Sequence, residues 1–287
     1  MIPTLSSEDA PSTLELGRRA YRRRQGRRSV LVSLGSTLVF AVLAWLLVVN
    51  TPGWSRVQQS FFSPDVAIAA FPRVIEGFLL NLRVLFFAVI GVAAFALLLA
   101  SLRTLRGPLF FPLRALSAAY TDLFRGVPLI IVLYVVGFGV PGLGVFPRMP
   151  QEFWGTIALI LVYSAYVAEV FRSGIEAVHP SQRLAARSLG LSYGQTMRRV
   201  VLPQAVRKVT PALMNDFVAM QKDVGLVSVL GAVDAVRAAQ IETAQFFNFT
   251  PYVVAGLLFV LLAWPMIRLT DWYTARVRAR EQMGSIV

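Results

Sequence analysis

The stretch VLVSLGSTLVFAVLAWLLVV, residues 30–49, contains 20 residues and no charged side chain. A helix rises about 1.5 Å per residue, so this stretch is long enough to cross roughly 30 Å of hydrocarbon. Of the 287 residues in the chain, 56% are hydrophobic, which is more apolar surface than a soluble domain of this length can bury. The sequence therefore predicts an all-α polytopic membrane protein.

Five further apolar runs have the length expected of membrane-spanning helices. They are residues 77–102, 116–138, 153–171, 210–230 and 253–269. The run at 210–230 is the most polar, because Asn215, Asp216, Lys222 and Asp223 interrupt it, and its alternative interpretation is a peripheral helix. With all six runs in the membrane, the sequence predicts about six transmembrane helices.

The basic residues between the runs favour six spans over five. The N-terminal segment alone carries seven arginines, whereas the connections on the opposite side of the membrane hold only Arg56, Arg73, Arg148 and Arg237. Since Lys and Arg accumulate in cytoplasmic loops, we expect both termini in the cytoplasm. The chain then divides into a flexible basic arm (1–29), a first span (30–50), an external connection (51–75), a larger transmembrane domain (76–272) and a cytoplasmic tail (273–287).

Composition excludes several classes of function. The net charge of +13 does not indicate a nucleic-acid partner, because the basic residues lie between apolar runs and form no face with interleaved aromatics. The arm at 1–29 suits the anionic lipid of the inner leaflet instead. Without cysteine there are no disulfides and no thiolate metal sites. The single histidine, His179, has no partner at catalytic or metal-ligand spacing, so we expect no catalytic site and no metal site.

The stretch RLAARSLGLSYGQTMRRVVLPQ, residues 183–204, is the most polar and basic segment between two apolar runs. Pro180 suits the first turn of a short helix, and Gly190 suits the position just after its end. Ser192 followed by Gln195 is a capping-box pattern that starts a second short helix, which the closing Leu-Pro pair is expected to break. Two readings remain for these helices: an interfacial loop held by lipid phosphates, or a docking element for a cytoplasmic partner.

This segment resembles the EAA loop of ABC-transporter permeases, whose pattern is E-A-A, three residues, G, nine residues, I, one residue and L-P. The same register here holds Leu184, Ala185, Ala186, Gly190, Val200, Leu202 and Pro203. Leu184 stands in place of the glutamate and Val200 in place of the isoleucine. The resemblance implies that residues 179–203, beginning at His179, form the coupling loop that docks on ATPase subunits.

Further motifs are similar to those of the permeases for polar amino acids, and the resemblance covers roughly residues 77–272. They are GFLLNL (77–82), FRGVPL (124–129), SAYVAEVFRSGI (164–175) and LPQAVRKVTPALMNDFVAMQKDVGL (202–226). The resemblance implies a type I ABC importer domain in the cytoplasmic membrane of a bacterium or archaeon. It also implies two ATPase subunits that hold ATP and Mg, an extracytoplasmic solute-binding protein, and a second permease subunit, identical or related.

Charged side chains within the spans are expected to pair or to line a wet cavity, because a lone charge at the bilayer centre costs roughly 2.5–3.5 kcal/mol. For Glu169 we expect an ion pair with Arg172 or Arg125, and contact with substrate is the alternative. Lys222 and Asp223 are further candidates for structural ion pairs.

The substrate path is expected along the most polar span. Asn215 and Asp216 are its candidate polar side chains. Pro211 and Pro128 are expected either to free backbone groups for a polar ligand or merely to kink their helices.

Two rival classes of protein remain. A membrane-embedded enzyme needs a cluster of catalytic groups, and the lone His179 and the absent cysteine argue against it. An ion-coupled secondary transporter or channel for a small polar solute has a use for Glu169 and Asp216, but none for an EAA-like loop. No Gly-rich loop followed by G-K-[ST] occurs, so this chain is not expected to hydrolyse ATP itself.

Overall fold

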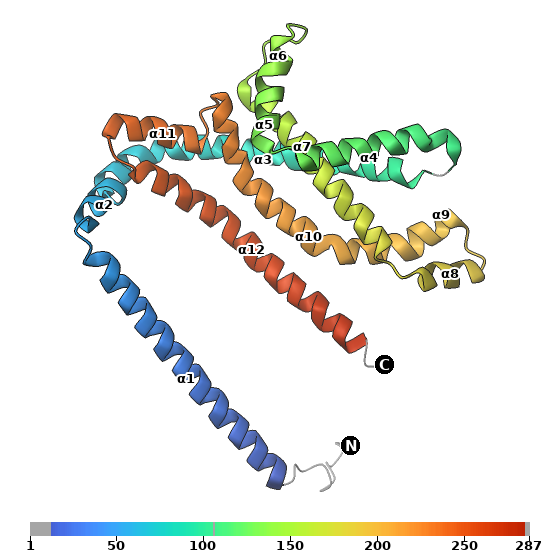
Figure 1. The fold of residues 1–287 in the computed structure, drawn as a ribbon, viewed down its shortest axis with the longest axis horizontal. Coiled ribbons are helices and arrows are strands. Elements are labelled where there is room, and N and C mark those ends of the chain that lie inside the picture. The colour runs from blue at the N-terminus through green and yellow to red at the C-terminus, as the bar shows by residue number, and fades with distance from the viewer. Residues whose placement is uncertain (1–12, 106, 285–287) are drawn as a thin grey trace, which may run out of the picture. The chain divides into compact units, whose positions relative to one another are not determined.

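The computed structural model describes residues 13–105 and 107–284, and these form helices joined by short connections without a β-strand (Figure 1). They divide into two compact units, with the boundary between Gln59 and Ser60. The elements in chain order are α1 (Thr13–Val49), α2 (Trp54–Phe61), α3 (Pro64–Thr104), α4 (Phe111–Gly126), α5 (Leu129–Tyr134), α6 (Val140–Gly142), α7 (Gln151–Glu176), α8 (Pro180–Ser188), α9 (Tyr193–Thr196), α10 (Leu202–Asp223), α11 (Ala235–Phe246) and α12 (Thr250–Gly284).

The first unit is built on α1, a single helix of 37 residues. The expected flexible arm is wrong from Thr13 onward, because the arginine-rich segment continues the same helix as the apolar span. Once the apolar run is helical, extending it costs no new nucleation, and arginine is a good helix former. Residues 1–12 lie outside the described part of the chain.

Four described helical segments are long and apolar enough to cross a membrane alone: Arg28–Val49, Trp54–Thr104, Gln151–Glu176 and Thr250–Val277. Two bent pairs raise the number to six, and they account for the predicted third and fifth spans. Residues 51–75, expected to be a connection, are largely helical, since they hold α2 and the start of α3. The described helices therefore allow between four and six spans, and the expected six is the largest number in that range.

The predicted span 116–138 is not one helix. It breaks after Gly126, and the two halves, Pro108–Gly126 and Leu129–Gly142, meet at 108°. The cause is Pro128, which disfavours helical geometry for the residue before it, and Val127 is accordingly extended at φ −97° and ψ 130°. Pro128 therefore breaks the helix and does not merely kink it.

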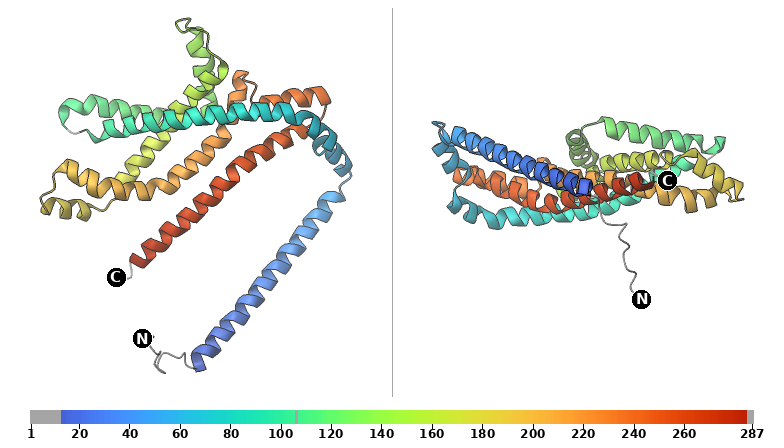
Figure 2. Two further views of the ribbon diagram at one scale, coloured as in Figure 1. Left: turned by 180° about the vertical axis from the view of Figure 1, so that it is seen from behind. Right: turned by 90° about the horizontal axis from the view of Figure 1, so that it is seen from below.

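The second unit is organised around α3, which runs along the length of the unit and packs most closely against α7 and α11 (Figures 1 and 2). The main core lies where α3, α5, α7 and the 3₁₀ segment Val224–Leu230 meet. Its most deeply buried members include Val84, Ala88, Leu133, Leu159 and Val227. Both views place α8, α9 and the loop between α3 and α4 at one end of this unit, and α11 at the other end.

A buried hydrogen-bond network fixes the junction before α11. Asn81 of α3 donates to the Val224 carbonyl over 3.0 Å and to Asp234 Oδ2 over 3.1 Å, and its Oδ1 accepts from the Ala235 amide. Asp234 caps α11 by accepting from the Arg237 amide. Neither side chain is exposed, and the pairing satisfies groups that would otherwise be costly to bury.

Candidate functional site

The first candidate element is α8, which starts at Pro180 and ends before Gly190 as the sequence predicts, and which is capped at both ends. His179 is its N-cap, and the His179 Nδ1 atom accepts from the Ser181 amide over 3.2 Å. At the other end Gly190 has φ 81°. The Gly190 amide donates to the Arg187 carbonyl over 3.0 Å and the Leu191 amide to the Ala186 carbonyl over 3.2 Å, which is the Schellman arrangement.

The second short helix, α9, also begins where it was predicted. The Gln195 amide donates to Ser192 Oγ over 3.3 Å, and the Ser192 amide donates to the Gln195 side-chain oxygen over 2.9 Å. This reciprocal pair is a complete capping box. Both short helices therefore follow from local capping chemistry.

The expected break at Leu202 and Pro203 is wrong. From α9 the chain passes through one π-helical turn, Met197–Val201, directly into α10. Proline removes an amide donor and crowds the carbonyl one turn earlier, and the wider π turn relieves that crowding. Gln204 Nε2 donates to the Val200 carbonyl over 3.0 Å and satisfies an acceptor in the altered turn. The second helix of this segment is thus continuous with α10.

Two hydrogen bonds from side chains to backbone carbonyls hold this region against the end of α7. Arg183 of α8 donates to the Ile175 carbonyl, and Lys208 Nζ, in the first half of α10, donates to the Ala177 carbonyl over 2.8 Å. Ala186 is buried, whereas Leu184 and Leu189 are 67% and 83% exposed. The segment therefore presents apolar side chains on a fixed support.

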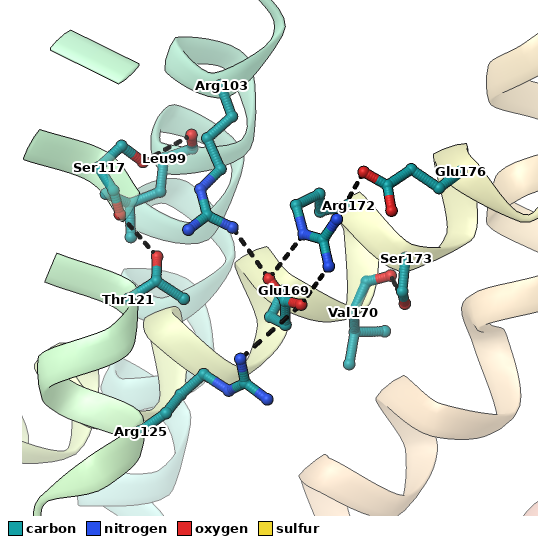
Figure 3. A network of polar contacts seen from close by, with 10 residues as sticks. All are labelled: Leu99, Arg103, Ser117, Thr121, Arg125, Glu169, Val170, Arg172, Ser173 and Glu176. Carbon is teal, nitrogen blue, oxygen red and sulfur yellow. Dashed lines mark hydrogen bonds and ion pairs between the residues drawn. The ribbon is translucent and has the colours of Figure 1, made fainter. Parts of the chain in front are cut away.

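The second candidate element is a charge cluster around Glu169 (Figure 3). Its carboxylate lies 2.6 Å from Arg172 Nη2 and 3.7 Å from Arg125 Nη1, so both pairs named as alternatives are present. Arg103 Nη1 lies 2.9 Å from the same carboxylate, a contact that the sequence did not indicate. Arg172 also pairs with Glu176. One carboxylate thereby joins α3, α4 and α7 near the end of the unit that carries α8.

The ion pairs expected of Lys222 and Asp223 do not form among the described residues. Neighbouring helical positions point about 100° apart, so the two side chains cannot face each other. Lys222 is exposed, and Asp223 instead accepts a hydrogen bond of 2.8 Å from the Tyr163 hydroxyl. Tyr163 is a polar partner that sequence reasoning missed, because 60 residues separate it from Asp223.

The residues proposed for the substrate path do not share one face. Asp216 lines a pocket of about 200 Å³ between α3, α7 and α10, whereas Asn215 is exposed elsewhere on α10. Pro211 lies inside α10 without breaking it. Pro128 lies at the sharp bend between α4 and α5. Of these four, only Asp216 faces the pocket.

Comparison with known proteins assigns a family to this arrangement. Residues 96–279 match the family described as binding-protein-dependent transport system inner membrane component. Over 202 residues the chain is 35% identical to the arginine transport system permease protein ArtQ of Bacillus subtilis, covering 69% of this chain and 89% of that protein. Over 180 residues it is 33% identical to the probable glutamine ABC transporter permease protein GlnM of the same organism, covering 62% and 82%.

Solved structures agree with this assignment. A chain of the crystal structure of an amino acid ABC transporter with histidines has a TM-score of 0.67 and 32% identity, over 73% of this chain and 96% of that one. An inward-facing structure of the MetNI methionine ABC transporter has a TM-score of 0.51 at 20% identity, which supports the fold alone. The chain belongs to the family of binding-protein-dependent transport system inner membrane components.

Proposed function

We propose that this chain is the permease subunit of an ATP-driven importer for polar amino acids. The observation that carries the proposal is the likeness to the solved amino acid ABC transporter, at 32% identity and a TM-score of 0.67 over 96% of that chain. The relatives named for arginine and glutamine transport point to the same substrate class. As a multi-pass permease of the inner membrane, the chain supplies a path for the solute and needs an energy source from partners.

Residues 179–203 are the proposed docking element for the ATPase subunits. Support comes from three features: both short helices are capped, Leu184 and Leu189 are exposed, and the second helix continues into α10. Exposed apolar side chains on a rigid support suit burial against a protein partner. The two ATPase subunits hold ATP and Mg in this proposal, and α10 transmits their movement into the membrane domain.

The remaining partners complete the path. An extracytoplasmic solute-binding protein delivers the amino acid, and a second permease subunit, either a copy of this chain or a relative, forms the other half of the membrane domain. Both termini lie in the cytoplasm, as the distribution of arginines favours. The helix Arg28–Val49 is an additional span outside the family match, which begins at residue 96.

The experiment is uptake into proteoliposomes that contain the permease and the ATPase encoded by neighbouring genes, with the matching solute-binding protein added outside. A panel of labelled amino acids is offered with and without internal ATP. We expect uptake of at least one polar amino acid that requires both ATP and the binding protein. Uptake driven by an ion gradient through the chain alone contradicts the proposal and favours a secondary transporter or channel.

A further inference from the structure

The pocket between α3, α7 and α10 has one carboxylate in a largely apolar wall. The pocket has a volume of about 200 Å³. Its lining consists mainly of aliphatic and aromatic side chains, among them Val92, Leu97, Val167, Phe171 and Leu213. Asp216 lies in this lining, and its Oδ2 atom is buried without a hydrogen-bond partner among residues 13–105 and 107–284. The pocket therefore contains an acceptor whose partner is missing.

No neighbouring side chain supplies that partner. The hydroxyl of Tyr163 also lines the pocket, but it is committed to Asp223 at 2.8 Å. No Lys, Arg or His belongs to the pocket lining, and among the described residues Asp216 forms no ion pair. The Asp216 side chain is partly buried, and a carboxylate oxygen shielded from water without a counter-charge is unfavourable. The shielded Oδ2 atom therefore favours a ligand from outside the chain as its partner.

An inorganic cation does not suit this chemistry. Calcium takes 6–8 oxygen ligands and magnesium demands octahedral coordination, whereas this pocket offers one carboxylate in an apolar wall. In the described part of the chain no group of three or more His, Asp or Glu side chains is arranged to hold a metal ion. The groups that line the pocket therefore suit an organic ligand and not a metal ion.

An organic cation on a hydrocarbon stem matches both features of the wall. Its charged end pairs with Asp216, and its methylene groups lie against the aliphatic side chains. The rings of Phe171, Phe217 and Tyr163 also line the pocket, and aromatic faces attract ammonium and guanidinium groups. The volume of about 200 Å³ is below the range typical of drug-sized ligands, so the occupant is small.

We propose that this pocket binds the side chain of a basic amino acid, with Asp216 as its counter-charge, so that the transported substrate is cationic. The proposal rests on the proposed function, since it names the class of amino acid that such an importer carries. The side chain of a neutral polar amino acid such as glutamine can donate a hydrogen bond to the carboxylate, but it does not neutralise its charge. The site then selects against neutral amino acids, because their side chains leave the charge of Asp216 unpaired.

The first test compares wild type with Asp216→Asn, which keeps the side-chain size and removes the charge. In the reconstituted complex, wild type is expected to take up lysine and arginine in preference to glutamine at equal concentration. The variant is expected to lower that preference by at least about tenfold, because truncating one member of a buried charge pair costs more than 1.4 kcal/mol. The same preference in both proteins overturns the proposal and means that Asp216 simply carries a proton.

Two matched variants locate the effect. The double change Asn215→Asp with Asp216→Asn keeps the net charge but moves the carboxylate to the neighbouring, exposed position on α10. It is expected to lose the preference as Asp216→Asn does, and retention of the preference contradicts a role for the pocket. Asp122→Asn removes an exposed charge on α4 and is expected to leave the preference unchanged.

A binding measurement separates this proposal from the proposed function. The chain has no cysteine, so Leu213→Cys places a single thiol on the pocket wall. Lysine is expected to slow its labelling by a small thiol reagent in the purified complex, whereas glutamine is not. If wild type moves no amino acid, the proposed function fails, yet the labelling still tests the pocket. Equal labelling with lysine and with glutamine overturns the pocket assignment even when transport is observed.

Discussion

Arg103 of α3 and Glu169 of α7 lie 66 residues apart in the sequence and 2.9 Å apart in space, and their ion pair ties the two central helices together. Arg172 and Arg125 share the same carboxylate. Three cations therefore converge on one anion, and the position of each depends on the charge of Glu169.

Glu169→Gln is expected to destabilise the membrane domain, because it leaves Arg103, Arg125 and Arg172 close together without the shared carboxylate. The loss is expected to be roughly 1–3 kcal/mol, below the 3–5 kcal/mol of a fully buried pair, since Arg125 and Arg172 are partly exposed. Thermal unfolding of the detergent-solubilised protein measures it. The control is Glu176→Gln, which removes an exposed carboxylate that pairs with Arg172 alone and is expected to change little. Equal losses in the two variants contradict a central role for Glu169.

Gly190→Ala is expected to distort the end of α8, because Gly190 has φ 81° and an L side chain is strained there whatever the free space. The cost falls on the docking element, so we expect reduced substrate transport per ATP hydrolysed while the stability of the spans changes little. Gly194→Ala is the matched control, since it adds the same methyl group in open space within α9 at an ordinary helical φ. If Gly190→Ala transports as much substrate per ATP hydrolysed as wild type, the segment is a loop that merely rests on the membrane surface.

Leu184→Glu is expected to weaken co-purification of the ATPase subunit, because it places an unpaired charge where an exposed leucine presents apolar surface. Gln182→Glu adds the same charge to α8 two residues earlier, about 200° around the helix, and is expected to have little effect. The ATPase retained on the tagged permease is the measurement. Undiminished retention with Leu184→Glu removes Leu184 from the interface.

Single cysteines in the cysteine-free chain test the membrane orientation. Ser188→Cys, in the proposed docking element, is expected to resist an impermeant thiol reagent added to intact cells, whereas Val145→Cys is expected to react. Both positions are exposed on the protein surface, so accessibility reports the side of the membrane. Reaction of Ser188→Cys from outside reverses the proposed topology.

Local signals in the sequence were sufficient for the two short helices of the docking element. Gly190 ends α8 and Ser192 starts α9 because capping involves residues only a few positions apart. The break predicted at Pro203 was wrong for the opposite reason. The π turn that accommodates this proline depends on how α10 packs and on Gln204, and neither is visible as a local propensity.

Contacts between distant helices were predicted only in part. Arg172 and Arg125 were found as partners of Glu169, since one lies on the same helix and the other in a recognisable motif. No feature of the sequence indicated Arg103 as a partner, because its pairing depends on how α3 lies against α7. The same applies to Tyr163 with Asp223. That Asp216 faces a pocket and Asn215 does not depends on the rotation of α10 about its axis, which residue types alone did not fix.

The π turn at Met197–Val201 lies between α9 and the pocket-lining part of α10, within one continuous helical run from Tyr193 to Asp223. A π turn holds about one residue more than an α turn. Its conversion to α geometry therefore rotates everything downstream by about 100° relative to α9. The register of this single turn therefore determines which face of α10 meets α3 and α7, and so places Asp216 rather than Asn215 at the pocket.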